Sequence, residues 1–190
     1  MPTIHCSNGL AAFLDLIAKS EGTSSSTITA NDGYDVIVSG VDGPHTFSDY
    51  SIHPFSQGRA PILVRGAQQG VPNTPAAIAA GGPPFAVKPV EELHSTASGR
   101  YQITLPTWEG LTKALGLGTF SPAAQDLAGI ELLRQASATD LIIDGQIATA
   151  ITRCSYTWAS FPGNDYRQGT RSIAWLLSTF NACLEALANK

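Results

Sequence analysis

The sequence predicts an α+β fold in which one mainly helical domain, residues 1–190, contains a small β-hairpin. Apolar residues recur with a helical period near both ends of the chain. Between residues 33 and 50 the period changes, and β-branched residues alternate with turn formers. The chain has 190 residues, of which 43% are hydrophobic and 14% charged. It can therefore close one sizeable core.

The first predicted helix spans Asn8 to Ser20. Ser7 or Asn8 can cap its N-terminus, and Gly22 suits the turn that ends it. Glu21 therefore lies at the C-terminal end of the helix, where the helix dipole disfavours a negative charge. The apolar face follows the spacing i, i+3, i+4 and i+7, with Leu10, Phe13, Leu14 and Ile17.

A β-hairpin is predicted between Gly33 and Tyr50, with strands at residues 34–38 and 45–50. The next segment, about 54–90, is rich in Pro, Gly and Ala and has no clear period. A structureless stretch of this length is uncommon inside a compact domain. We therefore interpret it as an inserted, partly mobile surface loop.

The remaining half of the chain is predicted to be helical. One helix runs from Thr104 or Leu105 to Ala114, and Ser121-Pro122 opens the next. Trp108 and Trp175 have the spacing of core residues. A third helix is expected over about 144–159, and Thr170 is expected to cap the last one. The predicted apolar positions of the second and the last helix are Leu127, Ile130, Leu133, Ile173, Leu176, Leu177, Phe180 and Leu184.

Composition argues against several functional classes. The formal net charge is −4 and the basic residues form no stripe, so nucleic acid is not expected as a partner. No apolar run approaches the ~20 residues that cross a bilayer. Residues 1–5 do not resemble a secretory leader, so we expect a protein held soluble in a cytoplasm. No metal site is expected, because the histidines and cysteines lack ligand spacing. They are His5, His45, His53, His94, Cys6, Cys154 and Cys183, and we expect the cysteines to be reduced packing residues.

Glu21 is the first candidate for chemistry. A glutamate near a helix end is usually a solvated surface residue. Here it follows a strongly apolar helix, it lies at the unfavourable pole of the dipole, and Gly22 lets the chain turn beside it. A carboxyl group disfavoured as an anion has a raised pKa, which suits a general acid near neutral pH.

A second candidate is the segment Ser95–Ile103, in which small hydroxyl residues lead into Gly99-Arg100-Tyr101-Gln102. Tyr101 offers a ring and a hydroxyl group, and Gln102 can both donate and accept hydrogen bonds. Saccharide sites need such polar groups beside an aromatic face. An ordinary polar turn is the alternative interpretation of this segment.

Seven motifs occur in a fixed order along the chain. They are Ala12-Phe13-Leu14; Ser20-Glu21-Gly22-Thr23; Gly33 to Val38; Asp49-Tyr50-Ser51 with His53-Pro54; Gly99-Arg100-Tyr101-Gln102; Phe120-Ser121-Pro122 with Gln125-Asp126; and Arg153-Cys154-Ser155 with Trp158-Ala159-Ser160 and Pro162-Gly163. Their order resembles the bacteriophage lambda lysozyme (endolysin) family of lytic transglycosylases, in the lysozyme-like superfamily. The resemblance covers nearly the whole chain except residues 54–89.

The resemblance implies a lysozyme-like fold with a groove between the helices and the β-hairpin. It implies that Glu21 is the single catalytic acid–base residue and that residues 99–102 form the floor of a saccharide cleft. Residues 158–168 would form one lip of the cleft, and the expanded region 54–95 the other. The expected substrate-binding residues are Tyr34, Asp35, Asp49, Ser98, Arg100, Tyr101, Gln102, Trp158 and Tyr166.

The resemblance also implies a substrate and a reaction. The substrate would be peptidoglycan, cut at the β-1,4 bond between N-acetylmuramic acid and N-acetylglucosamine. The product would be a 1,6-anhydro end, formed without water, metal or cofactor. The expected setting is a monomer that accumulates in a host cytoplasm, passes the membrane through a holin and acts in the periplasm. A tail-associated enzyme is an alternative setting.

Four alternatives stay open at this point. Asp35 or Asp49 could activate water, which would make the protein a hydrolytic muramidase. Asp35 could equally stabilise the hairpin by a hydrogen bond, and Trp158 could belong to the core. The whole chain could also be a binding module or virion component without turnover.

Overall fold

A buried N-terminal helix organises the body of the molecule. In this computed structural model, which describes residues 1–163 and 170–189, α1 runs from Asn8 to Ser20 as predicted. Ser7 caps it, because its hydroxyl accepts a hydrogen bond from the Leu10 amide. Most of the helix surface is buried, not only the predicted stripe. Whatever follows Ser20 is therefore attached to a rigid element.

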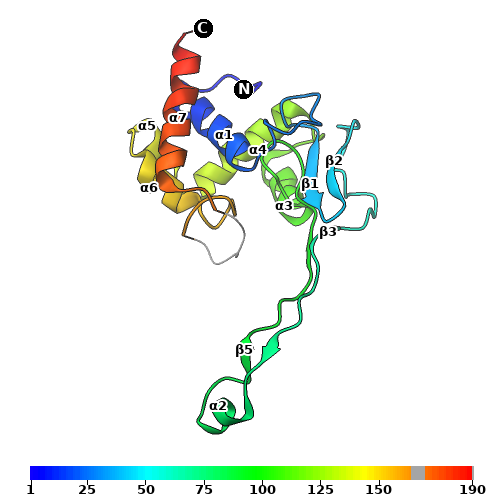
Figure 1. Cartoon of the computed structure of the whole chain (residues 1–190). Coiled ribbons are helices and arrows are strands. Elements are labelled where there is room, and N and C mark those ends of the chain that lie inside the picture. Colours follow the sequence, from blue (N-terminus) through cyan, green and yellow to red (C-terminus); the bar gives the residue numbers. More distant parts are fainter. Residues whose placement is uncertain (164–169, 190) are drawn as a thin grey trace.

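In the described part of the chain, five further helices belong to the body, which lies in the upper part of Figure 1. Helix α1 packs against α4, α5 and most extensively α7. The Phe13 ring lies edge-on to Phe161 and Phe180, with centroids 6.1 and 6.3 Å apart. Aromatic pairs of this kind add to the stability gained by burial. The helices are α3 (Leu105–Leu115), α4 (Pro122–Gln135), α5 (Thr139–Ile143), α6 (Ile147–Cys154) and α7 (Ile173–Ala188).

The predicted starts and stops of α3 and α4 are confirmed. Helix α3 begins at Leu105 and ends before Gly116, whose φ of 67° is the left-handed value that favours glycine. Ser121 caps α4 with its side chain. Trp108 is buried, as expected of a core residue.

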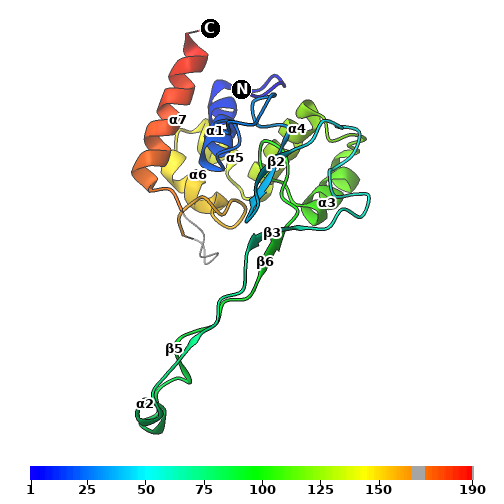
Figure 2. The ribbon, with the colours of Figure 1, turned by 45° about the vertical axis from the view of Figure 1, so that its right-hand side comes forward.

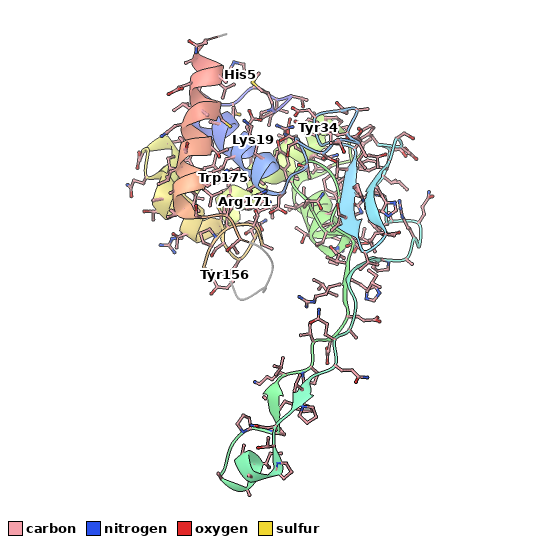
Figure 3. All side chains as sticks on the ribbon, in the orientation of Figure 1. His5, Lys19, Tyr34, Tyr156, Arg171 and Trp175 are labelled. Atoms are coloured by element: carbon pink, nitrogen blue, oxygen red, sulfur yellow. The ribbon has the colours of Figure 1, made fainter. Side chains whose placement is uncertain are left out.

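Other helix predictions need correction. The helix expected over 144–159 is shorter, because Gly145 has a left-handed φ of 74° and separates α5 from α6. Ser172, and not Thr170, caps α7. Leu127 is 46% and Trp175 38% exposed, so neither lies in the core. The guanidinium of Arg171 covers the Trp175 ring at 4.9 Å (Figure 3).

The predicted hairpin is formed by β1 (Val36–Gly40) and β2 (Gly43–Thr46), which pair antiparallel. The free edge of β1 receives a second segment from far along the chain. Val38 N–H donates to the Ala97 carbonyl at 2.9 Å, and Gly99 N–H donates to the Val36 carbonyl at 2.7 Å. The hairpin therefore positions residues 97–99 beside the end of α1.

Residues 62–95 form an arm that projects away from the helical body in both views (Figures 1 and 2). At its base, β3 (Ile62–Arg65) pairs with β6 (Leu93–Ser95). Further out, β4 (Val71–Pro72) pairs with β5 (Phe85–Val87), and α2 (Pro75–Ala79) lies at the tip. The segment that we interpreted as an inserted surface loop therefore contains strands and a short helix. Backbone pairing between its two halves gives the segment regular structure without a core of its own.

The described residues contain no helix with the length and apolarity needed to cross a membrane. All three cysteines are free thiols; Cys154 and Cys183 are buried and Cys6 is half-buried. Burial raises the pKa of the Cys154 thiol to about 12. The thiol of Cys154 is thus neutral and behaves as a packing group.

Candidate active site

Glu21 occupies the C-cap of α1, and the chain turns sharply after it. Its N–H donates to the Ile17 carbonyl at 2.9 Å, and Gly22 adopts a left-handed φ of 76°. The Thr23 hydroxyl donates to the carbonyl oxygens of Ala18 at 3.1 Å and Arg100 at 2.6 Å. The glutamate is thereby fixed between the end of α1 and the segment that follows the arm.

The carboxyl group of Glu21 is held by Ser160. The Ser160 hydroxyl lies 2.6 Å from Glu21 Oε1 and 2.9 Å from the Ser20 hydroxyl oxygen. Ser160 is 8% exposed and Ser20 4% exposed. These contacts join two segments that are 139 residues apart in the sequence.

Burial raises the pKa of Glu21 above its ordinary value. The hydrogen bonds from Ser160 and the positive charge of Arg171 oppose this shift without cancelling it. A carboxyl group with a raised pKa holds its proton nearer to neutral pH, as a general acid must.

Three adjoining cavities, here called the cleft, open beside Glu21. Their volumes are about 310, 210 and 410 Å³. Gln102 lines all three cavities, and Glu21 lines the first two. The base of the arm contributes Val64 and His94 to the wall of the largest cavity that contains Glu21.

The floor of the cleft is the segment Ala97–Ile103, which is paired along one side with β1 and closes on itself by hydrogen bonds between Ser98 and Ile103. Gln102 has a left-handed φ of 50° and donates to the Gly99 carbonyl at 3.0 Å. The predicted cleft-floor segment and the predicted acid therefore meet at one site.

Several predicted substrate-binding residues belong instead to a buried network beneath this floor. Arg100 is 2% exposed, and its guanidinium lies 2.6 Å from the carboxylate of Asp15. The hydroxyl groups of Tyr34 and Tyr101 both donate to Asp126, at 2.7 and 2.6 Å. Arg100 and Tyr34 do not line the cleft, and their hydrogen bonds to these buried carboxylates hold them beneath its floor. Tyr101 borders the third cavity but is 1% exposed.

Ser98, Asp35 and Asp49 also do not line the cleft. Ser98 is fully buried, and its hydroxyl donates to the Thr96 carbonyl at 3.2 Å. Asp35 accepts hydrogen bonds from the Thr29 hydroxyl and, at 2.8 Å, from the Ala30 amide. The side chain of Asp35 thus has a structural role in the loop that precedes β1, and its partners do not lie in the hairpin itself.

Asp49 is exposed and accepts a hydrogen bond from the Ser51 amide at 2.8 Å. The contacts with Ser51 lower the pKa of Asp49 below its usual value. Among the described residues that line the cleft, Glu21 is the sole carboxylic acid.

Trp158 serves both the core and the cleft. It is 2% exposed, it lines two of the cavities, and its indole N–H donates to the Tyr101 carbonyl at 3.1 Å. Tyr166, the remaining predicted residue, lies outside the described residues, as does much of the predicted lip over 158–168.

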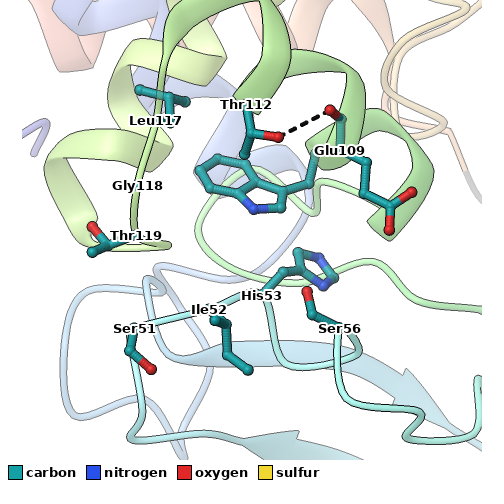
Figure 4. Close-up of a pocket in the computed structure, with 10 residues that line it drawn as sticks. Ser51, Ile52, His53, Ser56, Glu109, Thr112, Leu117, Gly118 and Thr119 are labelled. Carbon is teal, nitrogen blue, oxygen red and sulfur yellow. Dashed lines mark hydrogen bonds between the residues drawn. The ribbon is translucent and has the colours of Figure 1, made fainter.

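A separate pocket of about 260 Å³ lies between α3 and the loop that follows the hairpin (Figure 4). His53 and Trp108 line it, together with the exposed Glu109. It shares no residue with the cleft and lacks a buried carboxyl group. Within the described part of the chain, no group of three or more His, Cys, Asp or Glu is arranged to hold a metal ion.

Sequence reasoning missed two residues of the site. Ser160 contacts Glu21 directly, and His94 lines the same cavity as Glu21. Ser160 belongs to the motif Trp158-Ala159-Ser160, which could have indicated it. His94 had no signal of its own, because the pairing of β3 with β6 brings it to the cleft.

The fold and the site define a lysozyme-like protein, in which one partly buried glutamate faces a cleft between helices and a β-hairpin. Comparison with known proteins gives the family: the endolysin family model matches residues 11–186, and the chain belongs to this family of cell-wall lytic phage proteins. The endolysin of Escherichia phage P2 is 41% identical over 182 residues, which cover 95% of each protein. The endolysin of Escherichia phage lambda is 35% identical over 178 residues, covering 93% of this chain and 92% of the phage protein.

Solved structures agree with this assignment. Bacteriophage lambda lysozyme complexed with a chitohexasaccharide superimposes with a TM-score of 0.70 at 34% identity. A second structure of lysozyme from bacteriophage lambda gives 0.66 at 33% identity. Each match covers 95% of this chain and 97% of the solved one. The predicted lysozyme-like α+β fold is thereby confirmed.

Proposed function

We propose that this endolysin is a lytic transglycosylase that cuts the β-1,4 bond between N-acetylmuramic acid and N-acetylglucosamine, with Glu21 as its acid–base residue. The observation that supports this most directly is the position of Glu21. Its carboxyl group lies in a cleft, its pKa is raised by burial, and Ser160 fixes its orientation. The complex of the lambda lysozyme with a chitohexasaccharide supports a β-1,4-linked amino-sugar strand as the ligand.

In the first step, protonated Glu21 donates its proton to the glycosidic oxygen while the bond from this oxygen to the anomeric carbon breaks. The N-acetyl group of the muramic acid stabilises the positive charge that develops on the anomeric carbon. In the second step, the C6 hydroxyl oxygen of the same sugar bonds to the anomeric carbon, and its proton passes to Glu21. The carboxyl group is restored and the product is a 1,6-anhydro ring.

This scheme needs one carboxylic acid, whereas a hydrolase of the common type uses two. Asp35 is buried just before β1, where its carboxylate binds the preceding loop, and Asp49 is exposed outside the cleft. Their positions favour self-attack by the sugar over activation of water. Gln102 is the best-placed residue to bind sugar hydroxyl or N-acetyl groups, since it lines every cavity of the cleft.

The experiment is the substitution Glu21→Gln, which keeps the shape of the side chain and removes its transferable proton. We expect turnover of purified peptidoglycan to fall by roughly 100-fold or more, with the folded structure retained. The matched control is Glu109→Gln at an exposed site outside the cleft. Turnover by the Glu21→Gln protein at the rate of the control would overturn the assignment.

The products decide between transglycosylase and hydrolase. Glycan fragments released by a transglycosylase end in anhydro-muramic acid, which is lighter by one water than the reducing end that a muramidase leaves. Mass spectrometry of the digest should show the lighter ends. Reducing ends would show that water, and not the C6 hydroxyl group, is the nucleophile.

For the biological setting, we propose a monomer that is made in the host cytoplasm and reaches the wall of the periplasm through a holin lesion. Family membership supports this setting. Release of wall-degrading activity from expressing cells only when a holin is co-expressed would test it.

A further inference from the structure

The Ser160 hydroxyl lies between two oxygen atoms and can donate to only one of them at a time. Glu21 Oε1 is 2.6 Å away and the Ser20 hydroxyl oxygen 2.9 Å away. The Ser20 hydroxyl in turn lies 2.9 Å from the Ile17 carbonyl, which can only accept. Ser20 therefore donates to Ile17 and is left as an acceptor for Ser160.

The direction of the Ser160 proton depends on the charge of Glu21. A hydrogen bond to a carboxylate is shorter and stronger than one to a neutral hydroxyl group, so Ser160 donates to Glu21 when the glutamate is ionised. When a proton resides on Glu21 Oε1, the Ser160 oxygen can accept a hydrogen bond from this O–H group while the Ser160 hydroxyl donates to Ser20. Both arrangements satisfy every hydroxyl group without moving a heavy atom.

We propose that Ser160 is a positioning residue that holds the Glu21 carboxyl group in the same place in both of its protonation states, by turning its hydroxyl proton between Glu21 and Ser20. This inference rests on the proposed function, in which Glu21 loses and regains a proton in each turnover. A carboxyl group that moved each time its charge changed would lose its alignment with the glycosidic oxygen.

The backbone of Ser160 is also fixed by its neighbours, which supports this role. Its carbonyl accepts a hydrogen bond from the Arg171 amide at 2.8 Å, and its backbone N–H dipole lowers the pKa of Glu21. Ser160 thus connects the end of α1 to the segment that leads into α7. Among the described residues, Arg171 and His94 are the charged or titratable groups that face Glu21 from neighbouring elements, and the variants below leave both in place.

The test is the pH profile of kcat/KM for Ser160→Ala and Ser20→Ala. Removal of the Ser160 hydroxyl takes a donor from the anionic form, so we expect the alkaline limb to move upward by about one pH unit. Ser20→Ala removes the alternative acceptor and disfavours the protonated form, so the limb should move downward. The opposite signs distinguish the proposal from a general loss of packing.

Two further variants serve as controls. Ser160→Thr keeps a hydroxyl group and should restore the wild-type profile. Ser155→Ala removes a buried hydroxyl group that donates to the Thr152 carbonyl at 2.9 Å and, among the described residues, hydrogen-bonds to no carboxylate, so its profile should not move. A Ser160→Ala profile equal to that of Ser155→Ala would overturn the proposal. If Ser160→Ala does not fold, a downward shift in Ser20→Ala supports the proposal, and an unmoved profile overturns it.

The ¹³C NMR titration of the Glu21 carboxyl carbon gives the same shifts without any assay of activity. It also separates this inference from the proposed function. If the Glu21→Gln protein is active, the proposed function is wrong. If it is inactive but the titration of Glu21 is unchanged in Ser160→Ala and Ser20→Ala, only the proposed role of Ser160 is wrong.

Discussion

At the scale of single residues, the acid–base property of Glu21 depends on its buried position at the end of α1 more than on its neighbours in the sequence. The end of a buried helix removes the carboxyl group from water and raises its pKa. Arg171 and the donors of Ser160 limit this effect. The balance gives a group that can hold a proton and yet release it, which is the property a general acid–base residue needs.

The raised pKa of Glu21 has a consequence for stability. Between the pKa of an unfolded glutamate, ~4.3, and the higher pKa in the folded protein, the folded state binds more protons. The contribution of Glu21 to the free energy of unfolding is therefore largest at low pH, and it is lost as the pH rises through the pKa of the folded state. Glu21→Gln should raise the free energy of unfolding at pH 7 and lose this advantage near pH 4.

Chemical denaturation of Glu21→Gln and the wild-type protein at both pH values measures the effect. Glu109→Gln, at an exposed position, is the reference for a Glu-to-Gln change without burial. A stability difference between Glu21→Gln and wild type that is the same at pH 4 and pH 7 would contradict the raised pKa.

At the scale of elements, the floor of the cleft depends on one glycine. Gly99 has a φ of 75°, and a Cβ atom there would lie 2.1 Å from the side-chain oxygen of Gln125. The amide group of Gln125 is fully buried. It accepts from the Arg100 amide at 2.9 Å and donates to the carbonyl oxygens of Tyr34 at 3.1 Å and Phe120 at 3.0 Å. It therefore cannot move without breaking buried hydrogen bonds.

We expect Gly99→Ala to destabilise the protein by about 3–4 kcal/mol, from left-handed strain and lost buried hydrogen bonds. Gly116→Ala is the matched control, because its φ is 67° and no atom lies within 4 Å of the added methyl group. The free energy of unfolding of this control should fall by only ~1–2 kcal/mol. Urea unfolding of both variants gives the comparison, and equal losses would show that contact with Gln125 is unimportant.

Local sequence signals predicted the elements where capping and apolar spacing agreed. Helix α1 has its predicted bounds because Ser7, the apolar spacing and Gly22 all indicate the same ends. The helix expected over 144–159 is shorter, since Gly145 has a left-handed φ that delays its start to Ile147, and it ends at Cys154. The prediction that Trp175 lies in the core was wrong, because helical spacing identifies the residues that share one face of a helix but not what packs against that face. In the structure, the guanidinium of Arg171 covers the Trp175 ring.

At the scale of the whole molecule, the arm is the feature that the chain adds to its helical body (Figures 1 and 2). Its outer part, from β4 through α2 to β5, buries no side chain. Its base contributes Val64, Leu93 and His94 to the wall of the cleft. Stability and site geometry should therefore depend on the base and not on the tip.

Replacement of residues 69–89 by an Asn-Gly turn tests this division. Gln68 and Val90 exchange two backbone hydrogen bonds, of 2.8 and 2.9 Å, and such a pair can be closed by a two-residue turn. The free energy of unfolding should change by less than about 1 kcal/mol, because little apolar surface is lost and the loop to be closed is shorter. Cleavage of short soluble glycans should also be retained.

Thermal unfolding and a glycan-cleavage assay measure both expectations. A second deletion that also removes β3 and β6 takes away part of the cleft wall and should abolish cleavage. Loss of folding in the tip deletion would show that the outer arm stabilises the body.

The sequence by itself determined helices α1, α3 and α4, the hairpin and the glutamate at the end of α1, because caps, apolar periods and an ordered set of motifs are local properties. Only the tertiary structure decided which side chains face the cleft. Tyr34 and Arg100 belong to motifs beside the site, but Asp126 and Asp15 hold them beneath its floor. Ser160 reaches Glu21 from 139 residues away. Such contacts depend on the packing of distant elements, which no local pattern specifies.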